Sequence, residues 1–160
     1  MKKLSILATL FVGLFLTASC DSDRDSNPTL GQPSTFVLNT PAIADATYDL
    51  DHAETFKLTT SQPDYGYTAA TTYYIQASLH ADMSDYLEVS ATSHNVIIET
   101  KATKLANTVT QLLLNAGKEE ADFPLTTPLY LRLRASVGSS NGEGEVLSNT
   151  IELKSVRTSF

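Results

Sequence analysis

One segment near the C-terminus alternates strictly between apolar and polar side chains. Its apolar members are Leu129, Leu131, Leu133, Ala135 and Val137, and its polar members are Tyr130, Arg132, Arg134 and Ser136. Successive side chains of a β-strand point to opposite faces, so this pattern predicts a strand with one face on a core and one in solvent. The chain is therefore restricted to folds in which a sheet is covered on one side.

Further short strands are expected along the chain, separated by turn residues. They cover residues 36–38, 48–50, 55–59, 71–80, 96–98 and 147–153. The segments 129–137 and 147–153 are predicted to pair as a hairpin with a long loop. About seven short strands in one domain predict an all-β fold, an immunoglobulin/fibronectin type III-like antiparallel β-sandwich. An antibody-type domain is excluded, since the chain has one cysteine and no tryptophan.

One segment has helical instead of strand periodicity. Leu105, Val109, Leu112 and Leu113 recur at the spacing of one helix face. Thr103 is a suitable N-cap and Gly117 a suitable residue just beyond the C-terminal end. The sequence therefore predicts one short helix over 103–116, packed on the sheet edge through this apolar stripe.

The N-terminal residues 1–19 have the pattern of a lipoprotein signal peptide. Lys2 and Lys3 precede an apolar run from Leu4 to Leu16, and small residues lead to the single cysteine, Cys20. We expect Cys20 to be lipidated, with palmitate as an expected acyl group, and to become the first residue of the mature chain. It would serve as the membrane lipid anchor. The pattern departs from the usual one at Thr17, where leucine is preferred.

Two other roles for Cys20 fit the sequence less well. A disulfide would need a second cysteine, and the chain has none. A catalytic thiol would need a base placed beside it, and the nearest histidine along the chain is His52.

Charge restricts the partners of the processed chain. Removing residues 1–19 of 160 takes away Lys2 and Lys3, which leaves nine basic against 18 acidic residues, a formal charge of −9. Such a chain repels nucleic acid and anionic lipid, so nucleic acid is excluded as a partner. Membrane attachment would then depend on acyl chains and not on a basic patch.

The domain organisation follows from these segments. Residues 20–33 are polar, charged and without periodicity, which predicts a flexible acidic tether. The acidic residues after Cys20 are either a sorting signal or a plain solvated linker, and the residues alone favour the linker. Residues 34–156 are the expected β-sandwich domain.

No motif for catalysis, a metal or a cofactor is present in the sequence. The three histidines, His52, His80 and His94, lack the close spacing of a zinc motif and are expected on the surface. Asp82, Asp85 and Glu88 lack the glycine and the ligand spacing of a calcium loop. The clustered Asp45, Asp49 and Asp51 are equally unconvincing as a site. We therefore expect no catalytic residues, no cofactor and no metal, and a protein that is not an enzyme.

Tyr65 and Tyr67 are weak candidates for carbohydrate binding. They flank Gly66 in a predicted turn and could form a stacking surface, because a tyrosine ring combines a flat apolar area with a polar tip. Packing over the end of the sandwich is the alternative, and we favour it because half-buried tyrosine is ordinary.

Several motifs, in their order along the chain, resemble one known family. They are Pro28-Thr29-Leu30-Gly31, Phe36-Val37-Leu38-Asn39-Thr40-Pro41, Phe56-Lys57-Leu58, Gln62-Pro63-Asp64-Tyr65-Gly66, Tyr73-Tyr74-Ile75-Gln76-Ala77-Ser78, Leu129-Tyr130-Leu131-Arg132-Leu133-Arg134-Ala135 and Ser148-Asn149. Over roughly residues 28–155 the chain resembles the N-terminal immunoglobulin-like domain of SusE-type outer membrane lipoproteins, the SusE/SusF family.

The resemblance implies a lipoprotein on the outer face of the outer membrane, in a glycan-utilisation system. Its implied partners are a TonB-dependent transporter complex and a starch-like polysaccharide. It also implies that the acidic residues after Cys20 act as the surface-export signal. In this family the first domain resembles a spacer and later modules bind starch; the sequence given ends at Phe160, without such modules.

Two functions of different classes follow. The first is a noncatalytic accessory lipoprotein for glycan binding and uptake. The second is a structural or adhesion-type surface module that binds a protein partner, which would need an exposed edge strand or apolar patch.

Overall fold

The computed structural model describes Gly31, Pro33 and residues 36–138 and 144–160. The expected signal peptide 1–19, Cys20 and nearly all of the expected tether 20–33 lie outside the described residues. Within the described part, no helix is both long and apolar enough to cross a membrane.

The strands form two sheets. The larger has the order β1 (Thr47–Asp49), β8 (Ile151–Thr158), β6 (Leu125–Val137), β3 (Thr71–Ser78) and β4 (Leu87–Ser93), and β7 (Val146–Leu147) also pairs with β6. The smaller consists of β2 (Thr55–Thr59) and β5 (Ile97–Lys101). All pairs are antiparallel except β1 with β8, which is parallel. The expected all-β sandwich with one short helix is confirmed.

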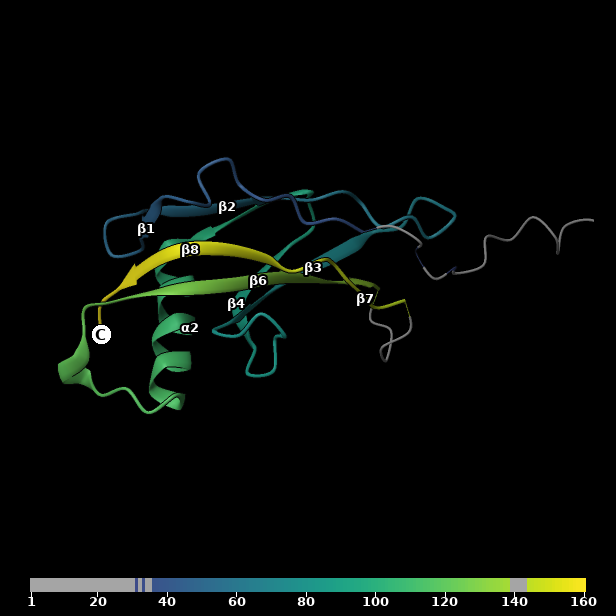
Figure 1. The fold of residues 1–160 in the computed structure, drawn as a ribbon. Helices are drawn as coiled ribbons and strands as arrows, with labels where there is room; N and C mark the ends of the chain where they lie inside the picture. The colour runs from purple at the N-terminus through teal and green to yellow at the C-terminus, as the bar shows by residue number, and fades with distance from the viewer. Residues whose placement is uncertain (1–30, 32, 34–35, 139–143) are drawn as a thin grey trace, which may run out of the picture.

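Both the small sheet and the helix α2 (Ala102–Asn115) cover the same face of the large sheet. The alternating apolar residues of β6, among them Leu131 and Leu133, are fully buried in one core with Leu58 of β2 and Leu105 of α2. In Figure 1, β8 and β6 cross in front of α2, with β2 above them. The polar residues of β6 consequently lie on the opposite face, away from the small sheet and α2, and its Tyr130, Arg132 and Arg134 are partly exposed.

The helix begins earlier than the sequence predicted. Its N-cap is Lys101, not Thr103, because β5 leads directly into the helix and the N–H of Ala102 donates to the carbonyl of Glu54. The predicted apolar stripe is confirmed as buried. At the C-terminal end Gly117 has φ +86°, and the N–H of Lys118 donates to the carbonyl of Leu113, as in a Schellman motif.

Residues 36–38 are not a regular strand, contrary to the sequence prediction. Leu38 forms an isolated bridge with Thr60 and is held on its other side by a side chain. Its N–H donates to the Asn149 side chain at 2.8 Å, and the Asn149 amide donates back to its carbonyl at 3.1 Å. Asn149 thus takes the place of a neighbouring strand for one residue, and the sheet does not extend here.

Strand β4 was missed by sequence reasoning. The signal in the sequence was the alternation of Leu87, Val89 and Ala91 with polar residues. It was weak because the run has few β-branched or aromatic residues. β4 is an edge strand of the large sheet, and its register with β3 shifts between Tyr74 and Gln76.

Candidate functional site

The face of the large sheet that lies away from the small sheet and α2 carries tyrosine and arginine side chains at neighbouring positions. We call it the tyrosine–arginine face and define it by Tyr74, Gln76, Tyr86, Glu88, Tyr130, Arg132, Arg134, Glu145 and Glu152. The register places Tyr74 opposite Arg134 and Gln76 opposite Arg132 across β3 and β6. On the other side of β3, Gln76 is opposite Glu88 of β4. Directly opposed residues share one face of a sheet, so these side chains meet.

Arg134 and Glu88 form the fixed centre of this face. Arg134 donates from Nε to Glu88 Oε1 at 2.7 Å and from a terminal nitrogen to Oε2 at 3.1 Å, a bidentate pair. Its other terminal nitrogen lies 2.5 Å from Glu145. The hydrogen bonds from Arg134 hold the pKa of Glu88 below its usual value, against partial burial, which raises it. The same contacts raise the pKa of Arg134 further above its usual range.

Gln76 links this pair to a second arginine. Gln76 is only 2% exposed, and its side-chain amide nitrogen donates to Glu88 Oε1 at 3.0 Å. Arg132 Nε in turn donates to the Gln76 carbonyl oxygen at 2.6 Å. Both polar groups of the buried amide are therefore satisfied, as a buried amide requires. Four residues of three strands thus form one continuous network.

Each arginine also lies over a tyrosine ring. The guanidinium carbon of Arg134 is 4.0 Å from the ring centroid of Tyr74, and that of Arg132 is 5.0 Å from the centroid of Tyr86. These are cation–π distances. On the β8 side, the hydroxyl of Tyr130 donates to Glu152 at 3.3 Å, and the nearby carboxylate raises the pKa of Tyr130.

The face offers a mixed set of polar groups with no large excess of charge. Two arginines are set against three glutamates, and the planar guanidinium, amide and carboxylate groups supply donors and acceptors side by side. Tyr86 is 44% exposed, so part of its ring is available to a ligand. Flat apolar area beside planar hydrogen-bonding groups suits a ligand rich in hydroxyl groups.

The two tyrosines that were weak candidates for carbohydrate binding, Tyr65 and Tyr67, lie outside this face. Tyr65 is completely buried, its hydroxyl donates to the carbonyl of Gly144 at 3.0 Å, and burial raises its pKa. Its ring packs inside the domain and presents no exposed stacking surface. Tyr67 is half-buried and lines a shallow pocket of about 400 Å³ together with Gln62 and Asp64.

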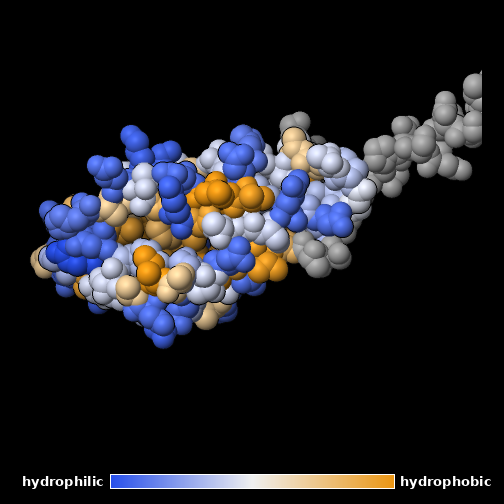
Figure 2. Space-filling model, turned by 90° about the horizontal axis from the view of Figure 1, so that it is seen from above, coloured by the Kyte–Doolittle hydropathy of each residue, from blue (hydrophilic) through white to orange (hydrophobic). Residues whose placement is uncertain are grey.

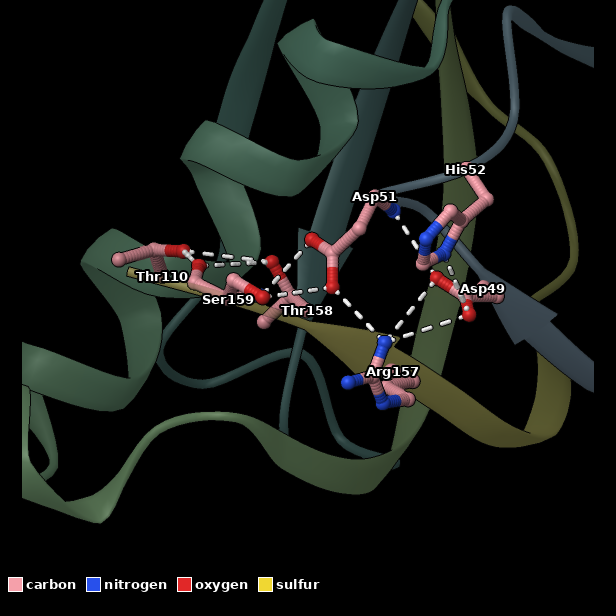
Figure 3. A network of polar contacts seen from close by, with 7 residues as sticks. All are labelled: Asp49, Asp51, His52, Thr110, Arg157, Thr158 and Ser159. Carbon is pink, nitrogen blue, oxygen red and sulfur yellow. Dashed lines mark hydrogen bonds and ion pairs between the residues drawn. The ribbon is translucent and has the colours of Figure 1, made fainter.

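Asp49, the last residue of β1, and Asp51, just after it, form a structural clamp, whereas Asp45 pairs with Lys154. Arg157 lies 3.2 Å from Asp49 and 3.0 Å from Asp51. Asp51 also accepts the backbone N–H of Ser159 at 2.9 Å and its hydroxyl at 2.7 Å, so it holds the C-terminal end of β8 (Figure 3). His52 lies beside Asp49 at 2.9 Å and is exposed.

Asp82, Asp85 and Glu88 also have separate partners. Asp82 accepts the N–H of Ser84, Asp85 accepts the hydroxyl of Ser78, and Glu88 belongs to the tyrosine–arginine face. Across the described ranges, no group of three or more His, Cys, Asp or Glu residues is placed to hold a metal ion.

A groove lies next to the clamp, between α2 and the C-terminal residues. Its volume is about 480 Å³, and its lining includes Asn107, Gln111 and Asp51. Phe160, which is 62% exposed, lies at its margin and stacks edge-on against Phe123. Because both oxygens of Asp51 already accept hydrogen bonds, the groove offers a ligand mostly amide, hydroxyl and apolar groups.

A family model matches residues 22–134, which is more than half of the chain; it describes the SusE outer membrane protein. The chain belongs to the SusE family. It is therefore an outer membrane protein of the SusE type, as its motifs suggested. The matched segment of this SusE-family protein runs from before β1 into β6. It contains Gln76, Arg132 and Arg134 but not Glu152. No solved structure matches the chain.

Sequence reasoning did not single out the tyrosine–arginine face of this SusE-family protein. It assigned Arg132 and Arg134 to the solvent side of their strand, which is confirmed, but it did not predict their partners. The signal in the sequence was the repeated use of tyrosine and arginine on the solvent side of the strand, where small polar residues would be sufficient. Gln76 and Arg132 are 56 positions apart, and only the strand register brings them together.

Proposed function

We propose that this protein is a noncatalytic lipoprotein on the outer surface of the outer membrane, accessory to the binding and uptake of a starch-like glycan. The tyrosine–arginine face is the proposed contact surface for the glycan. The observation that carries the assignment is the ordered set of planar donors, acceptors and rings on a partly exposed sheet face. The SusE family match supports the outer membrane setting.

The ordering of this face favours ligand binding over simple solvation. An exposed arginine normally loses side-chain entropy when it binds a ligand, about 0.5–1.5 kcal/mol for each immobilised side chain. Arg132 and Arg134 are already held by hydrogen bonds and by the rings of Tyr86 and Tyr74. Part of that cost is therefore met during folding, which benefits a weak, multivalent contact with a polymer.

Glycan binding by this face can be tested by affinity electrophoresis through gels that contain starch, pullulan or another α-glucan. The mature chain carrying Cys20→Ala should be retarded, and the double variant Tyr86→Ala with Arg132→Ala should migrate freely. Phe160→Ala, at the margin of the groove, is the matched aromatic control and should keep the retardation. If Phe160→Ala abolishes binding and the double variant does not, the glycan lies in the groove and the assignment to the sheet face is wrong.

Attachment to the membrane through Cys20 is part of the proposal. A lipid-anchored acidic chain with the tether 20–33 would hold the domain close to a TonB-dependent transporter complex, its proposed protein partner. Labelling cells with a radioactive fatty acid should mark the wild-type protein and leave Cys20→Ala unmarked. Equal labelling of both would exclude lipidation at this residue.

A second function, docking of a protein partner, is favoured by one observation. Val37 and Ile97 are 47% and 59% exposed, and the pairing of Leu38 with Thr60 and of Thr59 with Ile97 places them on the outward side of the small sheet. Figure 2, seen from the side of β1 and β2, shows hydrophobic patches between hydrophilic residues. If a partner docks here, the double variant Val37→Ser with Ile97→Ser should no longer co-purify with the transporter. The double variant of Tyr86 and Arg132 should still co-purify with it.

A further inference from the structure

We infer that the tyrosine–arginine face is built for a glycan that carries isolated uronic acid units, with Arg132 as the residue that binds the carboxylate. This inference rests on the proposed glycan-binding function and extends it from neutral to sparsely charged glycans. The feature that carries it is the different state of Arg132 compared with the other described arginines.

Arg132 has no carboxylate partner among the described residues, whereas the other two arginines there are each neutralised. Arg134 binds Glu88 and Glu145, and Arg157 binds Asp49 and Asp51. Among the residues that the structure describes, the only hydrogen-bond partner of the Arg132 side chain is the neutral amide of Gln76. In a chain with an excess of acidic residues, an arginine without an ion pair retains its full charge for a ligand.

The guanidinium of Arg132 is held in one orientation. Its Nε donates to Gln76 at 2.6 Å, and its guanidinium carbon lies over the ring of Tyr86, 5.0 Å from the ring centroid. Gln76 is buried and is itself fixed by Glu88, which Arg134 holds in a bidentate pair. No described residue bonds to the two terminal nitrogens of Arg132, which can donate two parallel hydrogen bonds to a ligand. That is the geometry in which arginine binds a carboxylate.

The surroundings of Arg132 suit a sugar ring that bears the carboxylate. The exposed part of the Tyr86 ring offers an apolar surface on one side. On the other side Glu152, opposite Tyr130 in the register, offers a carboxylate that accepts hydrogen bonds from hydroxyl groups. A uronic acid unit combines all three complementary features: a carboxylate, hydroxyl groups and an apolar ring face.

The charge of the chain limits how many acidic units the ligand carries. Glu88, Glu145 and Glu152 lie on the same face, and the mature chain has a formal charge of −9 after removal of residues 1–19. At physiological ionic strength charges interact over about 8 Å, so one carboxylate at Arg132 is affected mainly by its near neighbours. A polymer of consecutive uronates would place further carboxylates beside the glutamates and be repelled. The fitting ligand therefore has single uronate units separated by neutral sugars.

A set of matched oligosaccharides tests this inference on the mature chain carrying Cys20→Ala. Titration calorimetry would compare a neutral xylo-oligosaccharide, the same backbone with one glucuronic acid branch, that branched compound with its carboxyl group reduced to an alcohol, and an oligogalacturonate. We expect the branched acid to bind about two- to fivefold more tightly than its reduced form at low salt, a gain typical of a partly exposed ion pair. The gain should shrink in high salt, and the oligogalacturonate should bind more weakly than the branched acid.

Two variants that remove one positive charge separate a local contact from general electrostatics. Arg132→Gln should abolish the preference for the acid over its reduced form, measured as the ratio of the two affinities within the variant. Lys118→Gln, on the exposed residue after the helix, should keep the preference. Circular dichroism would check that both variants are folded.

The outcomes distinguish this inference from the proposed function. If the neutral, acidic and reduced sugars bind equally well, or if Arg132→Gln keeps the preference, the inference is overturned and glycan binding stands. If an acidic pentapeptide binds through Arg132 and the branched acid does not, the carboxylate comes from a protein and the inference is again overturned. If no oligosaccharide in the set binds, and the α-glucans of the electrophoresis also fail to bind, both proposals are wrong.

Discussion

Replacing Gln76 with leucine removes the link between the two halves of the polar network without leaving a large cavity. Gln76 is 2% exposed and makes two hydrogen bonds, to Glu88 and from Arg132, and each has one charged partner. A hydrogen bond to a charged group contributes about 1.5–3 kcal/mol when its partner stays buried. Here the Glu88 side chain is 35% exposed and Arg132 also reaches solvent, so both can bind water in the variant.

The expected net loss in the free energy of unfolding is therefore smaller, about 1–2 kcal/mol, because rehydration of the partners and the added apolar burial offset part of the lost bonds. With an m-value of about 2 kcal/mol per M, the urea midpoint should fall by about 0.5–1 M. Far-UV circular dichroism is the suitable probe, since the chain has no tryptophan.

Gln111→Leu is the control, because Gln111 is exposed on α2 and, within the described ranges, its side chain bonds to no residue but the nearby Asn115. It should change the midpoint by no more than about 0.3 M, as exposed substitutions do. A Gln76→Leu variant as stable as the wild type, or more stable, would refute the reasoning. It would mean that the network is as dispensable as some buried ion pairs have proved to be.

Three further outcomes follow from the same structure. Leu105→Ala, at the fully buried centre of the helix stripe, should lower the free energy of unfolding by about 2–5 kcal/mol in urea titration, and a loss below 1 kcal/mol would contradict the packing of α2 on the sheet. Gly117→Ala should cost about 1 kcal/mol by the same measurement although nothing lies within 4 Å of the added carbon, since φ is +86°; an unchanged midpoint would exclude the left-handed end of α2. Because the folded state lowers the pKa of Glu88 below its ordinary value of 4.5, this residue adds stability above that pH, and the contribution is lost as pH falls through the lower folded pKa. Glu88→Gln should therefore lose more stability at pH 7 than at pH 3, and an equal loss at both would contradict the ion pair with Arg134.

Local sequence patterns were sufficient to predict the strands and helices whose two faces differ strongly in polarity. Strict alternation over 129–137 predicted a strand with one buried face, and β6 has that pattern of burial. The stripe that includes Leu105 and Leu112 predicted the helix, and both residues are buried. These predictions succeed because the chemical difference between core and solvent imposes period 2 on a half-buried strand and about 3.6 on a half-buried helix.

Local patterns failed where a distant residue decides the outcome. Residues 36–38 have the composition of a strand, yet the Asn149 side chain occupies the bonding groups of Leu38 and ends the sheet there. Tyr65 is buried, in keeping with the packing that we favoured, but its hydrogen-bond partner, the carbonyl of Gly144, is 79 residues away and was not predicted. No window of sequence around either position contains the partner.

The sequence by itself determined the class of this protein: an acidic all-β sandwich behind a segment with the features of a lipoprotein signal, with motifs of the SusE family. Composition and periodicity are enough for this, because they act within a few residues of each position. Tertiary structure alone decided which polar side chains form a surface. The register of β3 with β6 and β4 joins Arg132 to Gln76 and leaves Arg132 without a carboxylate among the described residues. That register is set by the burial of the opposite face, where a slip of one residue would expose the core.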